Sequence, residues 1–124
     1  MIKNKNIIIT GALGLLGKSL TAELAQRGAN IIMLDIKSKK QLKEIQNLNL
    51  IKNKINYIKC NVSNIKSVIK TDKILKRKFP RIDVLINAAA ITDRVEGNSS
   101  NPKKSMFENY SIKDWNKSIL GNLN

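Results

Sequence analysis

Apolar residues along the chain gather in short unbroken runs that alternate with stretches of helical spacing. A short unbroken run is typical of a strand buried on both faces, as in a parallel sheet covered by helices. Such runs predict strands at residues 5–10, 30–34, 55–60 and 82–86. In the first run Ile7, Ile8 and Ile9 follow one another without a polar residue between them.

Helical spacing predicts helices over residues 15–27, 38–50 and 64–79, with another that begins at Ser111. Ser38 with Gln41 indicates a capping box at the start of the second helix, and Gly28 is the expected glycine after the first. On the third helix, the residues expected to face the core are Ile65, Val68, Ile69 and Leu75. Polar and turn residues between 91 and 110 predict a long loop of the kind that binds ligands.

The alternation of strands and helices favours an α/β fold with a Rossmann-like, doubly wound parallel sheet. The expected strand order is 3-2-1-4, and the sheet is expected to be incomplete. At 124 residues the chain is expected to form a single partial domain, residues 1–124, truncated before any catalytic segment. The last strand would then lie at an exposed edge through Val84, Leu85 and Ile86, so the isolated chain is expected to be marginally stable or aggregation-prone.

Charge alters this picture little. Lys and Arg number 23 against 9 Asp and Glu, for a net charge of +14. The basic residues are spread along the chain and accompany no nucleic-acid motif, so we expect no specific nucleic-acid binding. The alternative that the net charge leaves open is a basic protein that binds nucleic acid or an anionic surface. No apolar run is long enough to span a membrane, and no leader pattern is seen, so a cytoplasmic location is expected.

Histidine is absent and Cys60 is the one cysteine, which excludes a histidine base and a cysteine–histidine metal cluster. We expect Cys60 to be buried and reduced.

Three glycines, Gly11, Gly14 and Gly17, follow the first strand and open the first helix. Backbone N–H groups at a helix start lack intrahelical acceptors and lie at the positive end of the helix dipole. A glycine turn that brings these groups close to a ligand forms an anion site, and a pyrophosphate is its natural occupant. Three spaced glycines alone are a weak signal, which the strand before them and the helix after them strengthen.

Asp35 ends the second strand at close to the spacing expected of a carboxylate that accepts hydrogen bonds from an adenosine ribose. A carboxylate there repels a 2′-phosphate, which favours NAD over NADP. Lys37, Lys39 and Lys40 soften that repulsion. A turn or helix-cap role for Asp35 is the alternative.

Together with Asp35, the segments Thr10–Gly17, Asn61-Val62 and Asn87-Ala88-Ala89-Ala90, followed by Trp115 and Asn122-Leu123, resemble a short-chain dehydrogenase/reductase. The resemblance covers essentially the whole chain and corresponds to the first half of such an enzyme. It implies a dinucleotide site, with NAD preferred over NADP, formed by Thr10, Gly11, Gly14, Leu15, Leu16, Gly17, Asp35, Asn61, Val62, Asn87, Ala88 and Ala89.

The resemblance also implies hydride transfer between nicotinamide and a small carbonyl or hydroxyl substrate, in a family whose full-length members form homo-oligomers. Asn122 resembles the family's proton-relay asparagine. The tyrosine-xxx-lysine pair that the family uses is missing, because the residues four positions after Tyr57 and Tyr110 are Asn61 and Asp114. We therefore expect the dinucleotide-binding portion of an oxidoreductase that is inactive alone, with a non-catalytic NAD-binding module or sensor as the alternative.

Overall fold

Four parallel strands form one sheet whose spatial order, with the strands numbered along the chain, is 3-2-1-4. The computed structural model describes residues 2–91 and 107–122. The strands are β1 (Asn6–Thr10), β2 (Asn30–Asp35), β3 (Ile55–Lys59) and β4 (Val84–Asn87). Both the predicted α/β fold and the predicted strand order are confirmed, and the predicted strand bounds are correct to within two residues.

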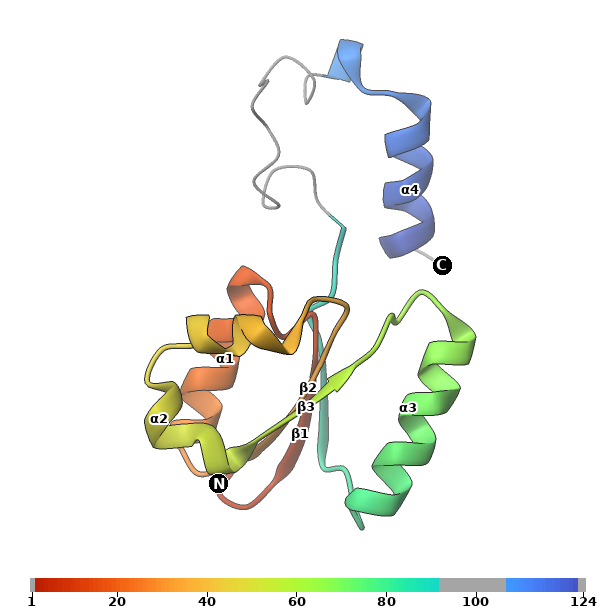
Figure 1. Cartoon of the computed structure of the whole chain (residues 1–124). Helices are drawn as coiled ribbons and strands as arrows, with labels where there is room; N and C mark the ends of the chain where they lie inside the picture. Colours follow the sequence, from red (N-terminus) through yellow and green to blue (C-terminus); the bar gives the residue numbers. More distant parts are fainter. Residues whose placement is uncertain (1, 92–106, 123–124) are drawn as a thin grey trace. The chain divides into compact units, whose positions relative to one another are not determined.

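Helices cover both faces of this sheet, as the apolar strands require. On one face lie α1 (Leu15–Gln26) and α2 (Leu48–Ile51), and on the other lies α3 (Ile65–Lys78) (Figure 1). Two apolar clusters result, because successive strand side chains point to opposite faces. Ile7, Ile9, Ile31 and Met33 belong to the cluster on the α1 side, and Ile8, Ile32, Leu34 and Ile58 to the other. Cys60 is buried in the second cluster as a free thiol, as predicted.

The predicted end of α1 is confirmed at Gly28. Its φ of +89° lies in the left-handed region, where a glycine costs least. The Gly28 N–H donates to the carbonyl of Ala25, and its own carbonyl accepts from Asn4. Glycine therefore closes the helix and turns the chain toward β2.

The predicted continuous helix over residues 38–50 is wrong. A 3-10 helix, η1 (Lys39–Glu44), is followed by α2 and a second 3-10 helix, η2 (Lys52–Lys54). Ile45 is extended and buried, and Asn47 adopts a left-handed conformation with φ 57°. The chain breaks at these residues because Ile45 and Ile51 both reach the core, which a single straight helix does not allow here. Ser38 does cap η1, through Lys40 N–H, but no returning bond from Gln41 is found among the described residues.

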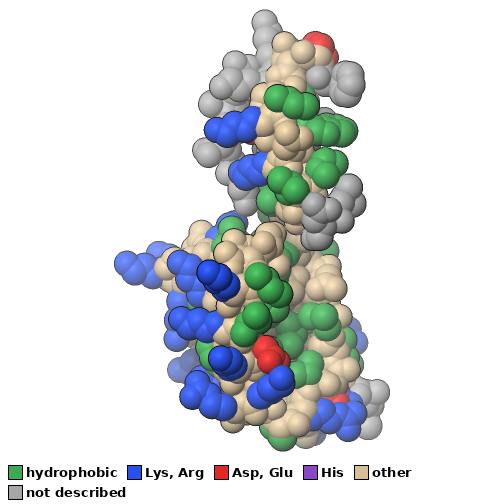
Figure 2. All heavy atoms as spheres, turned by 90° about the vertical axis from the view of Figure 1, so that its right-hand side faces the viewer, with side chains coloured by type: hydrophobic (Ala, Val, Ile, Leu, Met, Phe, Trp, Pro, Cys, Tyr) green, Lys and Arg blue, Asp and Glu red, His purple; other side chains and the backbone are tan. Residues whose placement is uncertain are grey.

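The prediction for the face of α3 that covers the sheet is confirmed at Leu75 and wrong at Ile65, Val68 and Ile69. Thr71 is buried, and Ile74, Leu75 and Phe79 pack on the sheet, whereas Ile65, Val68 and Ile69 are exposed. The carboxyl-terminal half of the helix therefore lies over the apolar strands. Figure 2, which faces α3, shows hydrophobic side chains exposed on this surface beside Lys and Arg side chains.

Strand β4 pairs with β1 on one side and has no strand on its other side within the described residues. Val84 is 41% exposed and Leu85 57%, as predicted for an edge, while Ile86 packs on the core.

The chain divides into two compact units, Met1–Ala89 and Ala90–Asn124, and the sheet belongs to the first. The second contains the 3-10 helix η4 (Phe107–Asn109) and α4 (Ile112–Asn122). The Ser111 hydroxyl accepts from the Asp114 N–H and donates to its carboxylate, so the predicted cap is confirmed. Most of the predicted loop at residues 91–110 lies outside the described residues.

Candidate functional site

The carboxyl ends of the four parallel strands lie at one edge of the sheet, and most of the predicted site residues lie there. Thr10 ends β1 and pairs in register with Asn87, the last residue of β4. Its hydroxyl oxygen accepts hydrogen bonds from the N–H groups of Ala88, at 3.1 Å, and Ala89, at 3.2 Å. Thr10 therefore fastens the segment after β4 to the start of the glycine turn.

Gly11 and Gly17 are required by close backbone contacts in this turn. Gly11 has φ +62°, and a Cβ there would lie 2.6 Å from the Cα of Ala89. A Cβ on Gly17 would lie 2.3 Å from the carbonyl oxygen of Gly11. Only glycine at both positions lets helix α1 begin directly against the turn and the turn pass against the segment after β4.

The start of α1 has the features of an anion site. The first helical bond runs from Lys18 N–H to the carbonyl of Gly14, so the N–H groups of Leu15, Leu16 and Gly17 have no intrahelical acceptor. Gly14 is the N-cap residue and has no side chain to cover them. The side chains of Leu15 and Leu16 are 74% and 63% exposed beside these donors. The residues present thus fit a pyrophosphate, with polar donors on the backbone and apolar side chains around them.

Asp35 joins the glycine turn to the end of β2. One carboxylate oxygen accepts from the N–H of Leu13 at 2.8 Å, and the other accepts from the N–H of Lys37 at 2.9 Å. Asp35 is only 6% exposed, so these bonds are shielded from water. The turn role that the sequence left open as an alternative is therefore observed, and a carboxylate with two oxygens keeps further lone pairs for a ribose hydroxyl.

Tyr57 is a residue of this edge that the sequence did not single out as a site residue. Its hydroxyl donates to the backbone carbonyls of Asp35 and Lys37. Burial, and then the charge of Asp35, raise the pKa of Tyr57. The cross-strand register of β3 with β2 brings the side chain there, and a single sequence gives no signal for that register.

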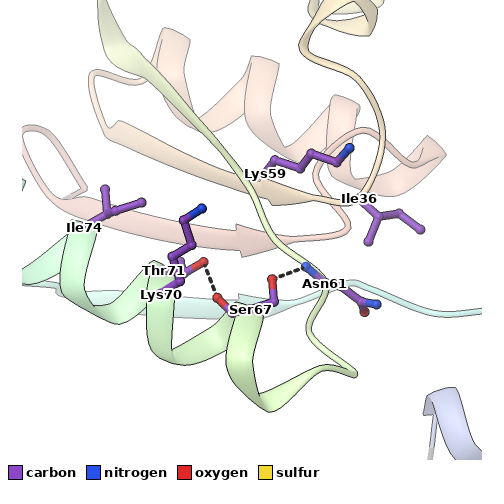
Figure 3. A pocket seen from close by; sticks show the side chains of 7 residues that line it. All are labelled: Ile36, Lys59, Asn61, Ser67, Lys70, Thr71 and Ile74. Carbon is purple, nitrogen blue, oxygen red and sulfur yellow. Dashed lines mark hydrogen bonds between the residues drawn. The ribbon is translucent and has the colours of Figure 1, made fainter.

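Asn61 follows β3 and borders a pocket of about 480 Å³ (Figure 3). Its side-chain oxygen accepts from the Ser63 N–H at 3.0 Å, and its own N–H donates to the Ser67 hydroxyl at 2.9 Å. The adjacent Val62 is 42% exposed. Figure 3 shows side chains from β3, from the segment after β3, from α3 and from the residue after β2 around the pocket: Ile36, Lys59, Asn61, Ser67, Lys70, Thr71 and Ile74. Of the predicted cofactor residues, only Asn61 lines this pocket.

Asn122 belongs to the second unit. Its side-chain oxygen accepts from the Ile91 N–H at 2.7 Å, and its amide nitrogen donates to the Ile91 carbonyl at 2.9 Å. Gly121 lies so close to the Ile91 side chain that a Cβ would be 2.1 Å from it. Helix α4 therefore bonds the backbone of Ile91 through Asn122 and lies against its side chain at Gly121.

The family model described as short chain dehydrogenase matches residues 5–124. The human protein "Short-chain dehydrogenase/reductase 3" is 33% identical over 91 residues, which cover 73% of this chain and 30% of that protein. The chain belongs to the short-chain dehydrogenase/reductase family.

Solved structures show the same fold. A short-chain dehydrogenase/reductase from Brucella melitensis, titled a glucose/ribitol dehydrogenase, superposes with a TM-score of 0.75 at 24% identity, over 98% of this chain and 47% of that one. An NAD+-bound xylitol dehydrogenase superposes with a TM-score of 0.74 at 23% identity, over 98% of this chain and 44% of that one. The chain thus spans less than half the length of these relatives. Within the part of the chain that the structure describes, no helix is both long and apolar enough to cross a membrane.

Proposed function

We propose that residues 1–124 form a single partial domain that is the dinucleotide-binding portion of an oxidoreductase. The observation that carries the proposal is the glycine turn, where the N–H groups of Leu15, Leu16 and Gly17 have no intrahelical acceptor and the N-cap residue has no side chain to bond them. The pyrophosphate would lie on these groups, and the segment Asn87–Ala89 would approach the nicotinamide ribose. When bound, the dinucleotide supplies or accepts the hydride.

The proposal includes NAD as the preferred cofactor. The Asp35 carboxylate is buried at the end of β2, where a ribose hydroxyl can donate to it. A 2′-phosphate placed at the same position would meet a negative charge that two backbone N–H groups hold in place. Asn61 and Val62 would lie beside the adenine ring.

For the complete enzyme we propose hydride transfer to or from a small carbonyl or hydroxyl compound, with these residues binding the cofactor. The 124 residues contain no tyrosine followed four positions later by lysine, so we infer that they bind the dinucleotide without turning over substrate. We also propose that Asn122 is a proton-relay residue in the complete enzyme. In this structure both ends of its side-chain amide are bonded to the backbone of Ile91. Homo-oligomers of the complete enzyme and a cytoplasmic location complete the proposal, and the free thiol of Cys60 is compatible with that location.

Titration of the 124-residue chain with NADH, followed by the cofactor's fluorescence, tests the binding site. Gly11→Ala is expected to weaken NADH binding about tenfold or more, because a left-handed alanine costs roughly 1–2 kcal/mol and its Cβ meets the Ala89 backbone. NADPH is expected to bind the unsubstituted chain more weakly than NADH.

Gly28→Ala is the matched control, because Gly28 also has a positive φ but lies at the other end of α1. It is expected to lower the melting temperature and leave NADH affinity unchanged. Equal losses of affinity in the two variants would place the binding site away from the turn, and no NADH binding by the unsubstituted chain would refute the proposed function.

A further inference from the structure

The Tyr57 side chain is hydrogen-bonded to the backbone at the end of β2 and just after it. Its hydroxyl proton is shared between the carbonyl oxygen of Asp35, at 3.2 Å, and that of Lys37. Tyr57 lies on β3 in register with Met33 of β2, and its ring packs against the core cluster on the α1 side. The ring is thus anchored in the sheet while its hydroxyl reaches the connection that leaves the sheet.

The two carbonyls that Tyr57 bonds lie on either side of Ile36. The Lys37 N–H donates to the Asp35 carboxylate at 2.9 Å, so both the N–H and the carbonyl of Lys37 are held. Ile36 itself is 57% exposed and lines the pocket that Asn61 borders (Figure 3). The position of Ile36 over this pocket therefore depends on bonds made by its two neighbours.

We propose that Tyr57 is a positioning residue for recognition of the adenosine half of the dinucleotide. The proposal rests on the function proposed above. Tyr57 acts through Asp35, which would accept from the ribose, and through Ile36, which would border the adenine. Its own hydroxyl is engaged with the protein backbone.

The hydroxyl can do this across the neutral pH range. Burial and the negative charge of Asp35 raise the pKa of Tyr57, so the proton that makes both hydrogen bonds is retained. A phenolate would instead face two carbonyl oxygens and could donate to neither.

Tyr57→Phe removes only the hydroxyl and tests the proposal in the 124-residue chain. A net hydrogen bond of about 0.5–1.5 kcal/mol corresponds to roughly a 2- to 13-fold loss of affinity. We expect the affinities for NADH and for ADP-ribose to fall by the same factor within this range, because both ligands carry the adenosine. Amide hydrogen exchange is expected to rise at Lys37 and to stay unchanged in β1.

Ser38→Ala is the matched control. It removes a neighbouring hydroxyl that accepts from the Lys40 N–H at 3.3 Å and leaves the carbonyls of Asp35 and Lys37 bonded. It is expected to retain wild-type affinity for NADH. Unchanged affinity in Tyr57→Phe overturns the role of Tyr57, and so does a loss accompanied by faster exchange throughout β1, which means general destabilisation. Failure of the unsubstituted chain to bind NADH is a separate result that refutes the underlying function as well.

Discussion

At the scale of single residues, two aspartates accept hydrogen bonds from backbone N–H groups at the two ends of β1. Asp35 accepts from Leu13 in the turn that follows β1, and Asp83 accepts from Asn6, the first residue of β1, at 2.9 Å. The second carboxylate also lies 3.3 Å from the Lys5 amine and 2.8 Å from the Arg81 guanidinium. Asp35 thus bonds the turn of the candidate site after the carboxyl end of β1, while Asp83 bonds the amino end of the same strand.

Asp83 gives stability a defined pH dependence. The hydrogen bond from the Asn6 N–H, helped by Lys5 and Arg81, lowers the pKa of Asp83 below its usual value. A carboxylate whose pKa is lowered by folding stabilises the fold above its unfolded pKa, about 3.9, and loses this contribution as the pH falls through its folded pKa. Asp83→Asn is therefore expected to melt below the wild-type temperature at pH 7, and the difference is expected to close below about pH 4.

Thermal melts of both proteins between pH 7 and pH 2.5 measure this difference. Asp72→Asn is the control, because Asp72 pairs with Lys76 one helical turn away on α3, and both side chains are at least half exposed. It is expected to change the melting temperature little at any pH. A gap between Asp83→Asn and the wild type that stays constant with pH would show that Asp83 acts by packing and not by charge.

The roles of some of these residues can be predicted from the sequence, and those of others cannot. The positions of Gly11, Gly17 and Asp35 follow a local spacing, so the turn and the carboxylate beside it could be predicted. Asp35 and its partner Leu13 are 22 residues apart but belong to one strand–turn–helix–strand motif of recognisable spacing. Tyr57, 20 and 22 residues from its partners, and Asp83, 77 residues from Asn6, follow no such motif. Register depends on the packing of the whole sheet, so which residues of neighbouring strands meet cannot be read from local spacing in a single sequence.

At the scale of elements, the difference between local and long-range determinants explains two wrong predictions, the continuous helix over residues 38–50 and the core-facing side of α3. Strands and helix ends are set by local patterns. Such patterns predict both ends of α1 and the start of α4 at nearly the residues where the structure has them. Between residues 38 and 54 local helical spacing competes with the burial of Ile45 and Ile51 beside α1, and burial wins. On α3, Ile65 and Ile69 satisfy a helical stripe equally well, yet the sheet is covered by the later turns.

Asn47 distinguishes the observed break from a continuous helix. Its φ of 57° is left-handed, which asparagine tolerates better than other residues with a Cβ. Asn47→Ala is expected to lower the free energy of unfolding by about 1 kcal/mol in the observed structure. In a continuous helix the same change would raise it by roughly 0.5 kcal/mol, because alanine is the better helix former.

Urea denaturation followed by circular dichroism measures the sign of this effect. Asn53→Ala is the matched control, since Asn53 lies in η2 and does not have a positive φ. Asn47→Gly is expected to be at least as stable as Asn47→Ala, because glycine adopts the left-handed region freely. A stabilising effect of Asn47→Ala would contradict the break at this residue.

At the scale of the whole molecule, the first unit combines a strongly positive charge with exposed apolar surface. On the surface that carries α3, hydrophobic side chains lie beside Lys and Arg side chains (Figure 2), and Ile65, Val68 and Ile69 of this helix are exposed. On β4, Val84 and Leu85 are exposed beside backbone groups that pair with no strand among the described residues. Net charge opposes association of copies, while an unpaired apolar edge favours it. Because salt screens the first effect and not the second, association is expected to increase with ionic strength.

Leu85→Lys tests which surface drives this association. Leu85 is 57% exposed, so the amine can reach water, and a lysine on an edge strand disfavours pairing with another chain. Sedimentation velocity at several protein concentrations is expected to show more monomer for Leu85→Lys than for the unsubstituted chain, with unchanged far-UV circular dichroism. Leu50→Lys is the matched control, because Leu50 is 82% exposed but lies on α2. If Leu50→Lys dissociates the chain equally well, added charge and not the β4 edge is the cause, whereas an effect confined to Leu85 identifies β4 as the surface through which copies associate.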